Sequence, residues 1–146
     1  MTQSAQQTTE AMPIMPEQAP LKTVTAPEFV AAVFATLALA GERRVVDFGA
    51  ELDQHFERAF DRFVTLAQGL GFTPNFTLRT NKFGGDSSVF RECLYMMNRR
   101  DLIIIRNPDH RIIDINISAK RATQMLDQSM FSDPTVREAI LDAMTS

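Results

Sequence analysis

The feature that most limits the folds open to this chain is a segment that is apolar around the whole circumference of a helix. Residues 29–40 read FVAAVFATLALA, and Thr25 to Glu28 before them form a capping box, in which the Thr and Glu side chains satisfy backbone N–H groups at a helix start. Gly41 follows, at a position where helices commonly end. A helix from Pro27 to Ala40 has no polar face to turn to water, so other elements must surround it. We therefore predict a helix at the centre of the core.

The length of 146 residues suits one domain with an ordinary core. Residues 1–24 are rich in Gln, Thr, Ala and Pro, a composition that buries too little apolar surface to offset the entropy cost of ordering. We expect a disordered tail over residues 1–24 and a single α+β domain over residues 25–146. The alternative for the tail is a docking peptide built around Met12, Ile14 and Met15.

A second helix is predicted from about residue 50 to residue 70, closing at Gly71. Its apolar residues recur at three- and four-residue spacing, the pattern of an amphipathic helix. They are Leu52, Phe56, Ala59, Phe60, Phe63, Ala67 and Leu70. Carboxylates such as Glu51, Asp53, Glu57 and Asp61 fall on the other side, which predicts a solvated face. The short linkage predicts an antiparallel hairpin of the first two helices.

Residues 102–117 predict a β-hairpin, because two runs of β-branched residues flank the turn sequence Asn107-Pro108-Asp109-His110. The first run, residues 102–106, is apolar on both faces, which predicts a central strand. Residues 76–80 alternate and are the candidate for its other neighbour. The second run alternates as well, and its inward residues are expected to be Ile113, Ile115 and Ile117.

Three more helices complete the predicted fold. One begins near Ser88 with Phe90, Cys93, Leu94 and Met97 on one face, one follows Ser118 to about Met130, and the last opens at Ser132-Asp133-Pro134. The fold class is α+β: an N-terminal helical hairpin, a small antiparallel sheet and two C-terminal helices. The order of a helix followed by a hairpin over residues 76–117 resembles that of winged-helix proteins.

The composition favours a reducing compartment and argues against a membrane protein. Cys93 is the only cysteine, so no intramolecular disulfide can form. The N-terminus lacks the pattern of a secretory signal, and the longest apolar run has 12 residues against the ~20 needed to cross a bilayer. We expect a cytoplasmic protein with no membrane association.

We find no catalytic, metal-binding or cofactor-binding constellation in the sequence. His55 has no carboxylate or second histidine at metal-ligand spacing, and Cys93 falls on an apolar helix face. Gly84 and Gly85 precede a helix but lack the Lys-Ser/Thr ending of a phosphate loop. We therefore expect no enzyme activity, no metal and no cofactor.

The charge is distributed unevenly along the chain. Its net charge is −3, yet residues 74–122 hold nine Lys and Arg against five Asp and Glu. A basic helix and hairpin of this kind predict a small regulatory protein that binds DNA by phosphate contacts with little base readout. The residues expected to bind nucleic acid are Arg91, Arg99, Arg100, Arg106, His110, Arg111, Lys120 and Arg121.

The alternative function is a protein–protein interaction module, such as an adaptor, an antitoxin-like inhibitor or an assembly subunit. The apolar run at residues 102–105 would need a partner if it lay at a sheet edge. An acidic half and a basic half also suit self-association into a homo-oligomer.

Overall fold

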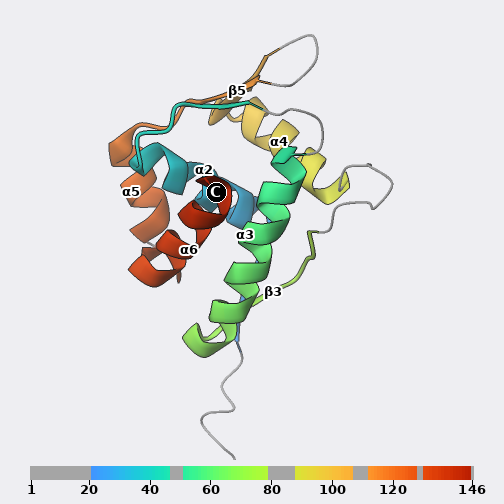
Figure 1. Cartoon of the computed structure of the whole chain (residues 1–146), viewed down its shortest axis with the longest axis vertical. Helices are drawn as coiled ribbons and strands as arrows, with labels where there is room; N and C mark the ends of the chain where they lie inside the picture. The colour runs from blue at the N-terminus through green and yellow to red at the C-terminus, as the bar shows by residue number, and fades with distance from the viewer. Residues whose placement is uncertain (1–20, 47–50, 79–87, 107–111, 128–129, 146) are drawn as a thin grey trace, which may run out of the picture.

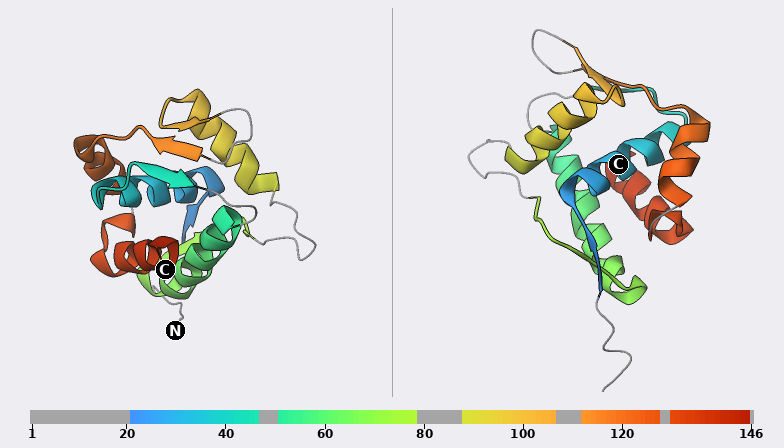
Figure 2. Two further views of the ribbon diagram at one scale, coloured as in Figure 1. Left: turned by 45° about the horizontal axis from the view of Figure 1, so that its top comes forward. Right: turned by 180° about the vertical axis from the view of Figure 1, so that it is seen from behind.

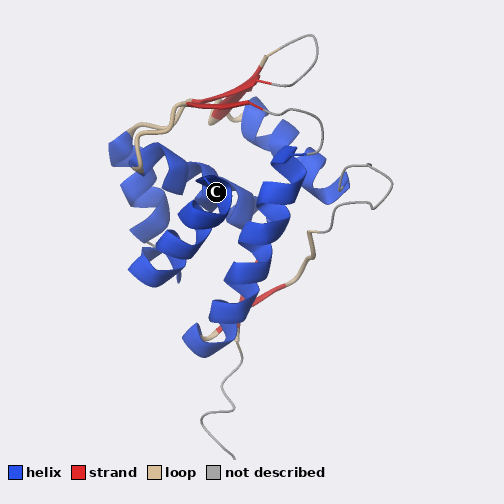
Figure 3. Cartoon of the chain, viewed as in Figure 1, coloured by secondary structure: helices blue, strands red, loops and turns tan. Residues whose placement is uncertain are grey.

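The computed structural model describes residues 21–46, 51–78, 88–106, 112–127 and 130–145 (Figure 1). Within these ranges helices dominate, and the strands are short (Figure 3). The elements in chain order are β1 (Lys22–Val24), α2 (Ala26–Leu39), β2 (Arg44–Val46), α3 (Glu51–Ala67), η2 (Gln68–Leu70), β3 (Phe72–Pro74), α4 (Ser88–Arg99), β4 (Ile103–Ile105), β5 (Ile112–Ile115), α5 (Ala119–Asp127), η3 (Met130–Ser132) and α6 (Pro134–Thr145). The α+β class is confirmed.

Helix α2 is the core helix, as its composition predicts. Thr25 and Glu28 form the expected capping box, and ten of the 14 residues of α2 are buried. Helices α4, α5 and α6 all pack against α2. A helix surrounded in this way needs no polar face, which is why a sequence without one is stable here.

Aromatic rings fill the space between α2 and α3. The ring centroid of Phe29 lies 5.9 Å from that of Phe60, 5.1 Å from that of Phe63 and 6.4 Å from that of Phe131 on η3. Phe63 stacks on Phe131 with 5.5 Å between centroids. We call Phe29, Phe60, Phe63 and Phe131 the phenylalanine core; each side chain is almost fully buried. The predicted apolar face of α3 is confirmed up to Ala67, whereas Leu70 is exposed.

The predicted helical hairpin of α2 and α3 is wrong. The backbone of α3 packs most extensively along α6, and α2 meets α3 through long phenylalanine side chains. The chain between the two helices is also more than a connector, because β2 lies there and joins a sheet. A strand between two helices carries the chain away from α2 before α3 begins.

The predicted β-hairpin is confirmed, but its place in the sheet is different. The sheet has the order β2-β5-β4, with antiparallel pairing of Ile104 with Asp114 and of Arg44 with Asp114 (Figure 2). The central strand is therefore β5, and β4 lies at an edge with Ile104 41% exposed. The inward residues Ile113 and Ile115 are buried as expected. The predicted turn at residues 107–110 lies outside the described residues.

A second, two-stranded sheet joins β1 to β3 in parallel, with Thr23 opposite Thr73 (Figure 2, right). Residues 22–24, assigned to the tail from the sequence, thus form a strand. The strand predicted at residues 76–80 is wrong for residues 76–78, which follow β3 without strand structure, and residues 79–80 lie outside the described ranges. Among the described residues, no pairing joins residues 76–78 to β4. The winged-helix arrangement stays a prediction.

Candidate nucleic-acid interface

The turn between α4 and β4 lies beside the chain that leads into α5. Asn116 joins the two, because its backbone N–H donates to the Leu102 carbonyl at 2.9 Å and its side-chain Nδ2 donates to the Asp101 carbonyl at 2.8 Å. Asp101 has a φ of 60°, a region that Asp tolerates better than most residues, so the chain can reverse there from helix to strand. These bonds link the turn that follows Arg99 and Arg100 to the segment that leads into α5.

Arg43, the residue before β2, is hydrogen-bonded to the end of β5 and to the segment that follows it. Its carbonyl accepts from the Ile115 N–H at 2.9 Å, and its Nη1 donates to the Ile117 carbonyl at 2.6 Å. Ser118 follows and caps α5, since its Oγ accepts from the Arg121 N–H at 3.1 Å. The start of β2 and the first turn of α5 are therefore neighbours.

Five exposed cations lie around these bonds, and we call them the basic end: Arg43, Arg99, Arg100, Lys120 and Arg121. Among the described residues, the last four make no ion pair. Two exposed carboxylates, Glu42 and Asp101, adjoin them in sequence. The first turn of α5 contains no acidic residue, so the partial positive charge at this helix start adds to the field of the lysine and arginine there.

Arg106 lies at the other end of the β4–β5 pair, where its N–H donates to the Ile112 carbonyl and its side chain bonds to Asp114. Arg44 Nε and Arg106 Nε lie 2.7 Å from the two carboxylate oxygens of Asp114. The hydrogen bond from Arg44, followed by the one from Arg106, lowers the pKa of Asp114, and the bond to Asp114 raises the pKa of Arg44. Because one carboxylate partly neutralises two guanidinium groups, this cluster is less cationic than the basic end.

Arg91 turns away from the basic end and into the molecule. Its Nη2 lies 2.7 Å from Oδ1 of Asp53, and the two side chains are 22% and 2% exposed. The guanidinium carbon also lies 5.5 Å from the centroid of the Phe90 ring. The predicted solvated position of Asp53 is therefore wrong, because a buried carboxylate is stable only with a partner such as this arginine. Arg91 positions α4 against α3 and does not belong to the candidate interface.

Of the eight residues expected to bind nucleic acid, four lie at the end of α4 and in the first turn of α5. The turn that follows Arg99 and Arg100 is bonded to Asn116, three residues before α5, whereas Arg106 is bound to a carboxylate and Arg91 packs against α3. His110 and Arg111 lie outside the described residues. Sequence reasoning missed Arg43, whose one signal was its place before Arg44-Val45-Val46, a weak strand pattern.

The thiol of Cys93 is buried in the core. Burial, and then the charge of Glu92, raises the pKa of the Cys93 thiol to about 11, so this thiol is protonated at neutral pH. Within the same residues no three His, Cys, Asp or Glu side chains gather as metal ligands would. Nor does any described helix have the length and hydropathy to span a bilayer.

Comparison of the chain with protein-family models, with curated proteins and with solved structures finds no match. The proposed function therefore rests on the geometry of the chain itself.

Proposed function

We propose that the protein binds nucleic acid through the phosphate contacts of its basic end. The observation that supports this most is that exposed cations stand on three segments that meet around residues 115–118: residue 43, residues 99–100 and residues 120–121. Backbone and side-chain hydrogen bonds of Arg43 and Asn116 join these segments to one another and to the end of β5. Like charges placed together repel, and a bound polyanion would relieve that repulsion.

The chemistry of this surface fits phosphate more than base edges. The start of α5 carries a positive partial charge and no acidic residue in its first turn, which favours phosphate at this helix start. Guanidinium groups such as Arg99 and Arg100 add hydrogen-bond donors in a planar fork that matches phosphate oxygens. No described recognition helix carries a set of base-reading side chains here, and we expect binding to depend little on sequence.

The decisive measurement is fluorescence anisotropy of a labelled random-sequence DNA duplex, titrated at low and moderate salt. Arg99→Ala/Arg100→Ala should weaken binding and reduce the slope of log K against log salt by about 0.9 for each phosphate that the variant no longer neutralises. Lys120→Ala/Arg121→Ala should do the same if both segments touch one ligand. The single-stranded and RNA forms of the probe distinguish a duplex binder from a general polyanion binder.

The matched control is Arg58→Ala/Arg62→Ala, which removes the same charge from α3, an element that contributes no residue to the basic end. Arg62 pairs with the exposed Asp142, and such surface pairs contribute little to stability. All three double variants should unfold at the same denaturant concentration as the wild type. Equal weakening of binding in the control and in Arg99→Ala/Arg100→Ala would show that only net charge matters and would refute a defined interface.

A second function, a protein–protein contact, is favoured by the outer face of the sheet. Ile104 is 41% exposed beside the Arg44–Asp114–Arg106 cluster, so an apolar side chain and charged side chains share this surface. On the edge of β4, the Ile105 N–H is already occupied by Asn98 Oδ1 at 3.2 Å. A partner would therefore meet the face of β4 instead of extending its edge. Sedimentation across a concentration series, with Ile104→Asp as the comparison, tests this function.

A further inference from the structure

Tyr95 places an aromatic ring in solvent on α4, the helix whose last turn carries Arg99 of the basic end. The Tyr95 side chain is 43% exposed, and no phenylalanine ring among the described residues is exposed to this degree. Tyr95 is also the only tyrosine of the chain, which contains no tryptophan. An exposed ring of this kind offers a flat surface on which another ring can stack.

One side of Tyr95 borders the sheet. Together with Ile105 and Ile113, it lines a small hollow between α4 and the β4–β5 pair, and α4 packs against β4 (Figure 1). The hollow has a volume of about 10 Å³, roughly the space of one water molecule, so no ring can enter it. A ligand can therefore meet Tyr95 only on its solvent side.

The charges on the two sides of Tyr95 along α4 differ in sign. Arg99 follows Tyr95 by four residues, and side chains at this spacing share a helix face, with Cβ atoms ~5–6 Å apart. Glu92 precedes Tyr95 by three residues and is exposed as well. A phosphate is attracted by Arg99 and by the neighbouring Arg100, whereas Glu92 repels it. A polyanion that touches Tyr95 should therefore extend from it toward the basic end.

We propose that Tyr95 stacks on an unpaired base of a single-stranded nucleic acid whose phosphates contact the basic end. Stacking at Tyr95 rests on the proposed function and narrows its ligand from nucleic acid in general to the single-stranded form. Paired bases stack on one another and expose only their edges, so a side-chain ring can lie on a base only where the base is unpaired. A stacking ring beside a cationic path binds single strands with little dependence on sequence, because every base has a π-face.

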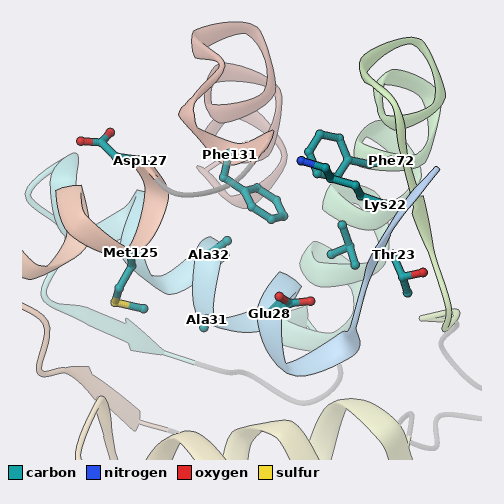
Figure 4. A pocket seen from close by; sticks show the side chains of 10 residues that line it. Lys22, Thr23, Glu28, Ala31, Ala32, Phe72, Met125, Asp127 and Phe131 are labelled. Carbon is teal, nitrogen blue, oxygen red and sulfur yellow. The ribbon is translucent and has the colours of Figure 1, made fainter. Parts of the chain in front are cut away.

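A second place where an aromatic ring borders a hollow is unsuited to such a strand. The hollow between β1, α2 and η3 has a volume of about 710 Å³, and Phe72 lies at its border (Figure 4). Of the described residues that line it, Glu28 and Asp127 are acidic and Lys22 is basic. Two carboxylates against one ammonium group repel phosphates, so the strand is expected at Tyr95 instead.

The test is the tyrosine fluorescence of the full chain, which reports on Tyr95 alone because there is no other tyrosine and no tryptophan. Oligothymidylate should quench this emission as it binds, since a stacked base lies on the ring. An abasic oligonucleotide of the same length, which offers phosphates without bases, should bind the basic end without quenching. A parallel titration of N-acetyltyrosinamide corrects for the light that the bases absorb.

Tyr95→Leu and Tyr95→Phe form a matched pair of variants. Tyr95→Leu keeps an apolar side chain but loses the ring, so its affinity for labelled oligothymidylate in fluorescence anisotropy should fall about tenfold. Its affinity for the abasic oligomer should not change. Tyr95→Phe keeps the ring and should bind both oligomers as the wild type does. Both variants should unfold at the wild-type urea concentration, which shows that the fold is kept.

Oligouridylate, titrated in parallel, distinguishes RNA from DNA as the source of the strand, and quenching by either supports the proposal. A duplex of the same length should bind without quenching. Equal affinity for oligothymidylate and the abasic oligomer, with unchanged emission, would overturn stacking at Tyr95 and leave the proposed function intact. Quenching by the duplex as strong as that by the single strand would also overturn it. If no oligomer binds at all, the proposed function fails, and stacking at Tyr95 fails with it.

Discussion

In the phenylalanine core each ring touches other rings and is removed from water, whereas at the basic end the side chains project into solvent from a framework of backbone hydrogen bonds. Phe29 alone contacts three other members of its cluster. Arg99 and Arg100 are held in place through the neighbouring Asp101 and Leu102. Removing a ring changes the packing of its neighbours, while removing the guanidinium of Arg99 or Arg100 leaves these hydrogen bonds intact. Stability and binding therefore depend on different residues in this protein.

The largest effect that we predict comes from the core side of this comparison. Phe29→Ala should lower the free energy of unfolding by about 3–5 kcal/mol, because it removes a fully buried ring and leaves a cavity among the remaining ones. Urea unfolding followed by circular dichroism measures the change. The control is Val64→Ala on α3, where the side chain is 41% exposed and the cost should stay below about 0.5 kcal/mol. Similar destabilisation of the two variants would contradict the central role of the phenylalanine core.

A smaller destabilisation is expected from loss of the Arg91–Asp53 ion pair. This pair is charged, as the basic end is, and largely buried, as the phenylalanine core is. Asp53→Ala should cost about 3 kcal/mol, because Arg91 would keep its charge in a largely buried place without this carboxylate. Asp142→Ala is the matched control, since it removes a carboxylate from an exposed arginine pair and should cost less than about 1 kcal/mol. Equal destabilisation by the two variants would show that burial of Asp53 is of no consequence.

The sequence was informative where structure depends on neighbours along the chain. The capping box at Thr25 and Glu28, the face of α3 and the hairpin of residues 102–117 all rest on local patterns, and the structure contains them. The α4 face with Phe90 and Met97 was found in the same way. In each case the period of the apolar residues decided the element.

The sequence was uninformative where distant segments meet. Strand β2 has three residues, and its partner Asp114 lies 70 positions beyond Arg44. Asp53 looked like any solvated helix carboxylate, because Arg91, 38 positions on, is visible as its partner only in three dimensions. Arg43 enters the basic end through a bond to Ile117, 74 positions away. Nothing local distinguishes these residues from other surface charges.

The smallest effect that we predict concerns Asp114, the carboxylate that bonds to Arg44 and Arg106 on the sheet. Its arginine bonds, Arg44 first and Arg106 second, lower its pKa in the folded state. A carboxyl group of lowered pKa stabilises the fold above the unfolded-state value of about 3.9, and that contribution disappears as pH falls through the lower folded-state pKa. Asp114→Asn should therefore be slightly less stable than wild type at pH 7, and the difference should vanish in acid.

Thermal unfolding of both proteins from neutral pH down to about pH 3 measures this difference. A difference in unfolding temperature between wild type and Asp114→Asn that stays constant over this pH range would mean that the packing of residue 114, and not its charge, stabilises the cluster. Asp114→Asn also frees Arg44 and Arg106 from their shared carboxylate. If the basic end binds DNA, these two guanidinium groups then join its field and the variant should bind more tightly, although it is the less stable protein. Affinity and stability moving in opposite directions in one variant would be the clearest separation of the two regions.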